Sequence, residues 1–297
     1  MAIAGPARTR VAIAVPNLNQ GQFLDAALDS LQQSGVDVAI ALVDAGSTDG
    51  SRAILERRQR NGELVYARSH ADAGQTAAIN EGVAAASQDD AGVRYVGWLN
   101  ADDLVLPGGF ASLVQALEAH PEWSAVAGRA QCVSESGAVI EEIATQPFSI
   151  ASFSHACTIC QPATLIRREA WEAIGGLDAS LHMCFDYDLW WRLARIGPIG
   201  YVDQFVAASR DHEATKTRQR REEYFREAIA LVRRETGGVP WHWCISEALE
   251  HQAGWILGRR PAGARKLLAG AEAVLAYIQR NLPGHRWGPK PSARVVG

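Results

Sequence analysis

The sequence predicts an α/β protein with a mostly parallel central sheet, helices on both faces of that sheet and a helical C-terminal extension. Over the first 120 residues, short apolar runs alternate with amphipathic stretches, which is typical of parallel strands joined by crossover helices. Four of these runs are followed at once by polar clusters. Because ligand sites on such sheets lie beyond the carboxyl ends of the strands, we expect one binding edge there.

The elements of the first half follow in order from apolar periodicity. A short apolar run bounded by turn residues indicates a buried strand, and apolar side chains three and four positions apart indicate a helix. Strands are predicted at residues 11–15, 38–43, 64–67 and 95–99, and helices at residues 23–31, 51–60, 76–86 and 109–120.

The second half is less regular. Residues 125–133 and 138–144 flank the turn SESG and predict a hairpin, and residues 145–161 are typical of a loop. Residues 163–176 predict a strand and a helix ended by two glycines, and residues 187–197 predict another helix. From Thr217 onward the pattern is helical, with breaks at residues 237–240 and 261. We therefore expect one domain over residues 1–212 and a helical extension over residues 213–297.

The net charge of −4 conceals an uneven distribution. Residues 210–297 carry a net charge of +7, and the rest of the chain carries −11. A basic tail is typical of proteins that bind nucleic acid or an anionic membrane, and also of solvated helices. No stacking platform or groove-entering motif accompanies the basic residues, which disfavours nucleic acid. A small helical extension packed on the main domain and docking at an anionic membrane surface remain as alternatives.

The sequence indicates a cytoplasmic protein with reduced cysteines. No apolar run reaches the roughly 18 to 20 residues that span a bilayer, and the first run stops at Pro16 without a cleavage signal. Five cysteines are scattered without a pairing pattern. Cys157 and Cys160 form a lone CxxC beside His155. Because a zinc site would need a fourth ligand, we expect unbridged thiols there.

The stretch WLNADD places Asn100, Asp102 and Asp103 directly after the fourth predicted strand. Two adjacent carboxylates repel one another and need water or a cation nearby. The chain has neither a GxGxxG turn nor a P-loop, so a bound diphosphate would need another source of positive charge. Mg²⁺ or Mn²⁺, which prefer oxygen ligands, would supply it. The alternative is that the two aspartates cap the turn or the following helix.

Six segments of the chain, taken in order, resemble the inverting family 2 glycosyltransferases, which have a Rossmann-like GT-A fold. The segments are VAIAVPNLNQGQFLDAALDSL, ALVDAGSTDGS, DAGQTAAINEGVAAA, VGWLNADDLVLPGGF, QPATLIRREAWEAIGGLD and FDYDLWWRLARIG. The resemblance implies a nucleotide-binding half at about residues 1–123 and an acceptor half at about residues 124–212. It also implies transfer of a sugar from a nucleoside-diphosphate sugar, with UDP as the expected nucleotide.

The resemblance further implies roles for residues of the second half. Asp186 matches the catalytic base, which would take the proton of the attacking hydroxyl. Trp190, Trp191 and Gln161 would lie on the acceptor side. From the residues alone, Asp186 is instead a first-turn helix acid favoured by the helix dipole, and the tryptophan pair is core with a half-exposed neighbour.

The metal and the donor would be held by residues at the predicted strand ends. Asp102 and His212 match positions that hold Mn²⁺ or Mg²⁺, and Asp103 is a further candidate ligand. His212 is alternatively a surface loop histidine. The positions that match the nucleotide-sugar pocket are Pro16, Asn17, Asn19, Asp44, Ala45, Ser47, Asp72, Gly74, Gln75, Asn100, Ala101 and Asp102.

Two departures from the family's pattern bear on activity. Asn100 replaces the first acid of the usual Asp-x-Asp, and an amide is a weaker partner for a cation; Ala45 replaces the second acid of a common Asp-Asp-Gly-Ser. We expect a metal-dependent inverting glycosyltransferase acting on a glycan or lipid-linked acceptor in bacterial-type surface polysaccharide synthesis, in the cytoplasm or at the inner face of the membrane. The alternative is a catalytically degenerate relative that binds nucleotide sugar without transfer.

Overall fold

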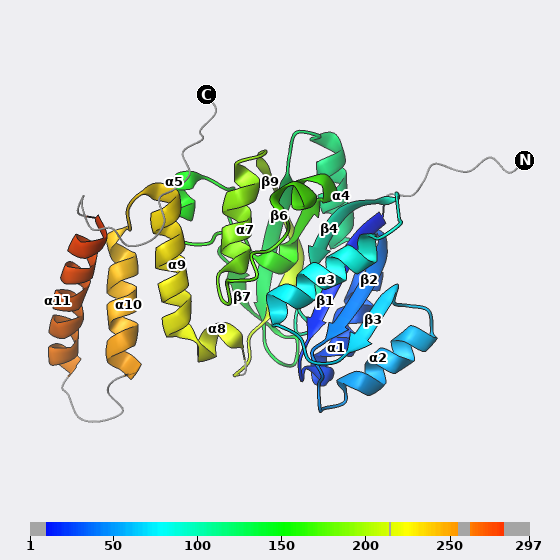
Figure 1. Ribbon diagram of the computed structural model, residues 1–297, viewed down its shortest axis with the longest axis horizontal. Coiled ribbons are helices and arrows are strands. Elements are labelled where there is room, and N and C mark those ends of the chain that lie inside the picture. Colours follow the sequence, from blue (N-terminus) through cyan, green and yellow to red (C-terminus); the bar gives the residue numbers. More distant parts are fainter. Residues whose placement is uncertain (1–9, 214, 255–261, 282–297) are drawn as a thin grey trace, which may run out of the picture. The chain divides into compact units, whose positions relative to one another are not determined.

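The computed structural model describes residues 10–213, 215–254 and 262–281 of the 297-residue chain. The chain divides into two compact units. Of the described residues, the first unit comprises 10–149 and 158–213 and contains the sheet, and the second comprises 150–157, 215–254 and 262–281 and is helical (Figure 1). The short segment 150–157 therefore belongs with the C-terminal helices although it lies in the middle of the sequence.

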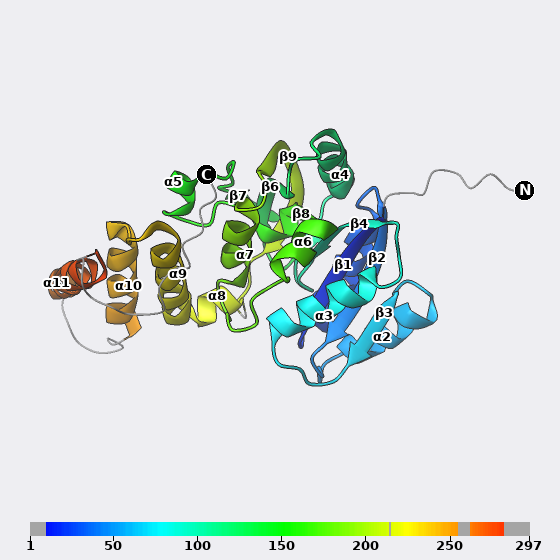
Figure 2. The ribbon, with the colours of Figure 1, turned by 45° about the horizontal axis from the view of Figure 1, so that its top comes forward.

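The first half of the sheet is entirely parallel. Its strands have the spatial order β3-β2-β1-β4, and nearly every residue of β1 and β2 is buried. Such continuous apolar runs arise because helices cover both faces of the sheet. Helices α1 and α2 contact one another and β2. Helix α3 contacts β1, β2 and β4 and lies against these strands in Figure 2. The bounds are β1 Arg10–Asn17, α1 Gly21–Gln32, β2 Asp37–Asp44, α2 Ser51–Arg60, β3 Tyr66–Ser69, α3 Gln75–Ser87 and β4 Val93–Trp98.

The second half of the sheet is mixed. Strand β8 pairs antiparallel with both β4 and β6, so the two halves form one sheet. The predicted hairpin is confirmed as β6 and β7. The bounds are β5 Leu104–Val105, α4 Gly109–Ala119, β6 Ala125–Val133, β7 Val139–Ile143, α5 Ile150–Phe153, the 3₁₀ turn η1 Gln161–Ala163, β8 Thr164–Arg167, α6 Arg168–Ile174, α7 Phe185–Ala194 and β9 Ile199–Arg210.

Several features differ from the sequence-based expectation, including the two-residue strand β5 and the turn η1, which were not predicted. Strand β9, parallel to β6, has no counterpart among the predicted elements, because its centre carries the exposed Asp203 and Gln204 and its pairing is interrupted by two register shifts. Strand β3 begins two residues later than predicted. The predicted loop at residues 145–161 contains the short helix α5.

The helical unit is held together by packing of α10 on α9 and α11. Its helices are α8 Lys216–Gln219, α9 Arg221–Thr236, α10 Trp241–Gly254 and α11 Ala262–Asn281. Helix α9 ends at Gly237, which has the left-handed φ of +77° that favours glycine. This break was predicted, whereas the break predicted at Pro261 lies outside the described residues.

Two findings concern membrane spans and cysteines. None of the helices in the described ranges combines the length and apolar character needed to cross a bilayer. All five cysteines are free thiols, as expected from their spacing.

Close packing of α3 on the sheet depends on Gly82. A Cβ atom at this position would lie 2.7 Å from the Cβ of Ala14 on β1 and 3.1 Å from a methyl group of Val43 on β2. Such approaches are far inside van der Waals contact, so any side chain here would push the helix off the strands.

We therefore expect Gly82→Val to lower the free energy of unfolding by about 1–3 kcal/mol through overpacking. Urea denaturation followed by circular dichroism measures this change. Ala84→Ser, on the exposed side of the same helix, is the control and should stay within about 0.5 kcal/mol of the wild type. A Gly82→Val protein as stable as this control would contradict the packing described.

Candidate functional site

Polar side chains gather where the parallel strands end. Strand β1 ends at Asn17, β2 at Asp44 and β3 at Ser69, and β4 runs into the turn that contains Asn100 and Asp102. Because these four strands are parallel and adjacent, their carboxyl ends form one edge. The edge predicted from the sequence is therefore present, and it carries the residues predicted to hold the nucleotide.

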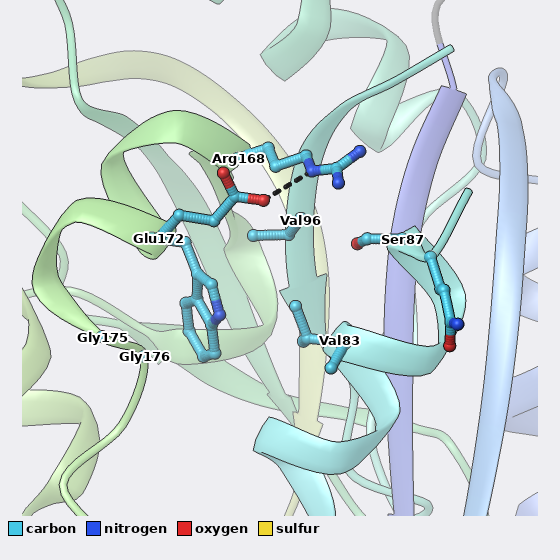
Figure 3. Close-up of a pocket in the computed structure, with 10 residues that line it drawn as sticks. Val83, Ser87, Val96, Arg168, Glu172, Gly175 and Gly176 are labelled. Atoms are coloured by element: carbon cyan, nitrogen blue, oxygen red, sulfur yellow. Dashed lines mark hydrogen bonds and ion pairs between the residues drawn. The ribbon is translucent and has the colours of Figure 1, made fainter. Parts of the chain in front are cut away.

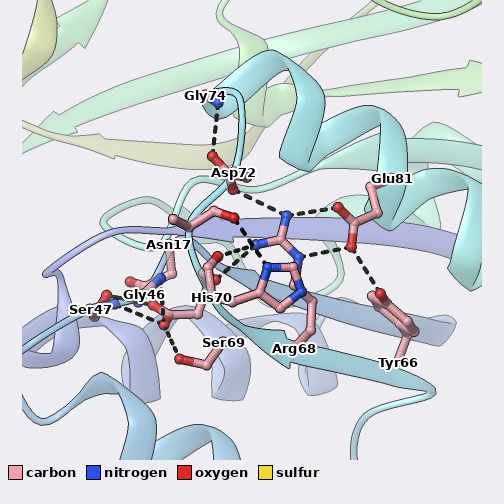
Figure 4. Close-up of polar contacts among 12 residues, drawn as sticks. Asn17, Gly46, Ser47, Tyr66, Arg68, Ser69, His70, Asp72, Gly74 and Glu81 are labelled. Carbon is pink, nitrogen blue, oxygen red and sulfur yellow. Dashed lines mark hydrogen bonds and ion pairs between the residues drawn. The ribbon is translucent and has the colours of Figure 1, made fainter.

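Asp44 is the centre of the hydrogen-bond network at this edge, and its partners Asn17, Ser47 and Ser69 are labelled in Figure 4. Its Oδ1 accepts from Asn17 Nδ2 at 2.7 Å and from the Ser47 hydroxyl. Its Oδ2 accepts from the backbone N–H groups of Gly46 and Ser47 and from the Ser69 hydroxyl. Burial would raise the pKa of Asp44, but the donors from Ser47, Ser69 and Asn17 hold it below the usual value. The carboxylate thus fixes the loop between β2 and α2.

Asn17 and Asn19 connect the β1 and β2 loops. Asn19 has a left-handed φ of +54°, and its Oδ1 accepts from Thr48 N–H at 2.8 Å. The amide of Ala45 donates to Asn17 O at 2.9 Å, so the position that lacks the family's second acid contributes through its backbone. The side-chain Oδ1 of Asn17 is buried and has no hydrogen-bond partner within the described part of the chain.

Arg68 on β3 was not singled out from the sequence, yet it organises the β3 loop. Its guanidinium is nearly buried and donates to both carboxylate oxygens of Glu81, to Asp72 Oδ2 at 3.1 Å, and to the carbonyls of Asp44 and His70 (Figure 4). The pKa of Arg68 is raised, chiefly by the hydrogen bonds to Glu81. In the sequence Arg68 directly follows the predicted strand at residues 64–67, and nothing there distinguishes it from a solvated arginine.

Asp72 serves the loop geometry as well. Its Oδ1 accepts from Gly74 N–H at 2.8 Å, and Gly74 has a φ of +113° that a side chain would strain. Helix α3 begins directly after this glycine, at Gln75. The position predicted to contact the nucleotide is thus held by Arg68 on one side and by the loop backbone on the other.

The turn after β4 joins the first edge to the far end of the sheet. Gln75 Nε2 donates to Asn100 Oδ1 at 2.9 Å, and Asn100 Nδ2 donates to Asp103 Oδ2 at 3.0 Å. Asp103 Oδ1 accepts from the N–H of Arg210, the last residue of β9, at 3.0 Å. Asn100 therefore uses its amide to connect Gln75 with the buried carboxylate, a task that requires a donor and an acceptor on one side chain.

Asp103 is buried and its pKa is raised to about 7, first by burial and second by the charge of Asp102. Since its oxygens accept from Asn100 and Arg210, it stabilises the turn rather than presenting an open ligand. Ala101 is also buried. Asp102 is therefore the more exposed carboxylate of this turn and the candidate for a metal.

Asp102 and His212 lie together. His212 Nε2 is 2.9 Å from Asp102 Oδ2, and both side chains are largely shielded from solvent. Arg210 donates to the carbonyl of Asp102 and stacks over Phe23 at 4.8 Å, while Phe23 also contacts the His212 ring. His212, 110 residues from Asp102, is therefore a buried partner of this turn and not a surface loop histidine.

These two side chains fit a hard divalent cation in part. Mg²⁺ and Mn²⁺ bound to nucleotides often take only one or two protein ligands, with phosphate and water oxygens completing the shell. A carboxylate oxygen and an imidazole nitrogen in contact supply such a pair. Over residues 10–213, 215–254 and 262–281, no group of three or more His, Cys, Asp or Glu side chains could enclose a metal alone.

Asp186 belongs to the same region. It lies in the first turn of α7, and its Oδ1 accepts from Tyr187 N–H at 2.7 Å. The pKa of Cys160 is raised, first by burial and then by the charges of Asp103 and Asp186. The ring of Phe185, the residue before Asp186, lies 6.2 Å from that of Trp98, the last residue of β4 before the Asn100–Asp103 turn. The Cys160 thiol is kept protonated and unreactive.

The three residues expected on the acceptor side are buried. Gln161 Nε2 donates to the carbonyl of Trp98 at 2.7 Å, and its Oε1 has no partner within the described residues. Trp190 is fully buried and stacks on Trp98 with ring centroids 6.5 Å apart. Trp191 is also buried rather than half-exposed, edge-on to Phe148. The indoles thus form the wall behind the site, and neither presents a free face to a sugar.

A cavity of 450 Å³ lies elsewhere, between α3 and α6 (Figure 3). Its lining includes Ser87 at the end of α3, together with Arg168 and Glu172, which pair at 2.7 Å. Gln75 and Ser87 are at opposite ends of α3, about 18 Å apart at 1.5 Å per residue. This cavity is therefore separate from the strand-end loops, and we assign no substrate to it.

Comparisons with known proteins point to one family. The model of the family described as "Glycosyl transferase family 2" matches residues 12–175. A chondroitin synthase of Escherichia coli is 23% identical over 195 residues, which are 65% of this chain and 28% of that synthase.

Two solved structures share the fold. The structure of S. aureus TarS 1–349 in complex with UDP-GlcNAc has a TM-score of 0.61 and 13% identity, over 91% of this chain and 82% of that chain. The mannosyltransferase PcManGT from Pyrobaculum calidifontis, in complex with GDP-Man and Mn²⁺, has a TM-score of 0.51 and 18% identity, over 90% and 70%.

We expect Asp44→Asn to lower the free energy of unfolding by about 2–4 kcal/mol at pH 7, because an amide cannot accept all these hydrogen bonds. The folded-state pKa lies below the usual 3.8, so this stabilisation is present above pH 3.8 and is lost as the pH falls through the folded-state value. The difference between wild type and variant should therefore be constant from pH 5 to 8 and shrink near pH 3.

Urea denaturation at pH 5, 7 and 3 measures this dependence. Asp203→Asn is the control, because its side chain is 82% exposed and should change the unfolding free energy by less than about 0.5 kcal/mol. An Asp44→Asn difference that persists undiminished at pH 3 would show that the charge of Asp44 is not what stabilises the loop.

Proposed function

The chain belongs to glycosyl transferase family 2 and is a glycosyltransferase, and we propose that it transfers a sugar from a UDP-sugar to a hydroxyl group with inversion at the anomeric carbon. The observation that carries this proposal is the position of Asp186. The ring of Phe185, its neighbour on α7, lies 6.2 Å from that of Trp98 at the end of β4, so a candidate base lies near the turn that carries Asp102. A general base and a cation site are the two parts that an inverting transfer requires.

Similarity of this chain to known proteins supports the proposed classes of donor and acceptor. TarS has been solved with UDP-GlcNAc, and this likeness supports a UDP-sugar donor. A relative named as a chondroitin synthase supports a glycan acceptor. We include lipid-linked glycans of bacterial-type surface polysaccharide synthesis, with transfer on the cytoplasmic side of a membrane.

The proposed transfer is a single displacement at the anomeric carbon of the donor sugar. The acceptor oxygen forms a bond to the anomeric carbon while the bond from that carbon to the diphosphate oxygen breaks, and the electron pair leaves with UDP. Asp186 takes the proton of the acceptor hydroxyl. Asp102 and His212 would hold Mn²⁺ or Mg²⁺, which when bound neutralises the charge that develops on the leaving diphosphate. Asn100 keeps the turn in place through Gln75 and Asp103.

We expect Asp186→Asn to lower kcat by about 10²–10⁴-fold, because an amide cannot accept the proton, while UDP binding with Mn²⁺ is unchanged. UDP release in the presence of Mn²⁺ and a panel of UDP-sugars and glycan acceptors measures turnover, and isothermal titration measures binding. Asp102→Asn should instead weaken Mn²⁺-dependent UDP binding. Asp203→Asn, remote and exposed, is the matched control and should behave as wild type.

Two results would overturn the assignment. If the wild type binds UDP with Mn²⁺ but releases none from any donor, the chain is a degenerate nucleotide-sugar-binding relative. If Asp186→Asn retains full turnover, Asp186 is a helix-terminus acid and the base lies elsewhere.

A further inference from the structure

Helix α11 presents an apolar face that residues 215–254 and 262–281 of the helical unit leave exposed. Leu275 is 60% exposed, and Val274, Tyr277 and Ile278 are each exposed by about two fifths or more. On a helical wheel of 100° per residue these four positions share one continuous arc. Four neighbouring exposed apolar side chains on one helix are unusual for a surface that faces only water.

The opposite side of α11 packs within the unit. Ala269 and Ala273 are buried, and Arg280 forms a two-pronged ion pair with Glu247 of α10 at 2.7 and 3.1 Å. Trp241, at the start of α10, is 40% exposed and contacts the Tyr277 ring edge-on at 5.5 Å. We call Trp241, Val274, Leu275, Tyr277 and Ile278 the α11 surface.

The charge of this part of the chain identifies the kind of partner. Residues 214–297 carry a net charge of +8, and residues 255–297 carry eight Lys or Arg and one Glu. The rest of the chain carries −12. A basic segment attracts an anionic surface, and exposed tryptophan, tyrosine and aliphatic side chains suit the boundary between lipid headgroups and acyl chains. The exposed Val139 and Ile140 on β7 differ, because two glutamates follow them directly.

We propose that the α11 surface docks the protein on an anionic lipid bilayer, with α11 lying in the interface. Helix α11 does not have the character of a spanning helix, since Arg265, Lys266, Glu272 and Arg280 interrupt its apolar residues. The proposal rests on the proposed function in that docking would bring the enzyme to a lipid-linked acceptor. Membrane binding is nevertheless measured without donor or acceptor, so the two can fail separately.

The test is co-sedimentation of the full chain with vesicles. We expect binding to phosphatidylcholine vesicles containing about 30% phosphatidylglycerol, little binding to pure phosphatidylcholine, and loss of binding at about 0.5 M salt, where charges are screened within a few ångströms. Leu275→Ser/Ile278→Ser should lower the partition coefficient by about tenfold or more, because two apolar side chains no longer enter the bilayer.

A matched control separates this surface from exposed apolar residues in general. Val139→Ser/Ile140→Ser removes two comparably exposed side chains from β7 and should bind vesicles as the wild type does. Thermal unfolding checks that both double variants remain folded.

Three outcomes would overturn the proposal. One is wild-type protein that does not sediment with anionic vesicles at low salt. Another is equal loss of binding in the two double variants. The third is a concentration-dependent dimer in light scattering that Leu275→Ser/Ile278→Ser abolishes, since the α11 surface would then bind a second copy of the chain.

Discussion

The pairing of β9 beside β6 is the constraint on which the site depends. It carries Arg210 to the turn after β4, where its N–H meets Asp103 and its guanidinium meets the carbonyl of Asp102. His212 follows two residues later and reaches Asp102. Without this strand, the carboxylates of the turn would have no partners from the far end of the sheet. The candidate metal pair is thus a product of sheet topology and not of the local sequence alone.

Much of the strand-end chemistry could be predicted because it is local. Asn17, Asp44 and the turn after β4 each follow a buried apolar run directly, so their place at one edge follows from parallel pairing. The roles of Arg68 and Arg210 could not be predicted, because an arginine in a strand is usually solvated, and only the folded chain shows what surrounds it. The burial of Trp190 and Trp191 was likewise undetermined, since an aromatic pair on a helix packs inward or outward according to its neighbours.

The aspartate carboxylates at this edge have different partners from one strand end to the next. The carboxylate of Asp44 is balanced by neutral donors, and that of Asp72 by the guanidinium of Arg68. Burial and the neighbouring charge of Asp102 raise the pKa of Asp103 to about 7, which favours its neutral form. Asp102 is left with a histidine, the partner that a cation can most readily share.

The segment 150–157 makes the two units interleaved along the chain. The residues before and after this segment belong to the sheet unit. Within the helical unit, the carbonyl of Ser154 accepts a hydrogen bond from Trp243 and that of His155 accepts one from His242. Phe153, in the same segment, is fully buried in the intact chain. A fragment ending near residue 213 would strip this segment of those donors while keeping it covalently attached. The helical unit is therefore not a detachable module, and an excised sheet domain would carry a loose, apolar insertion prone to aggregation.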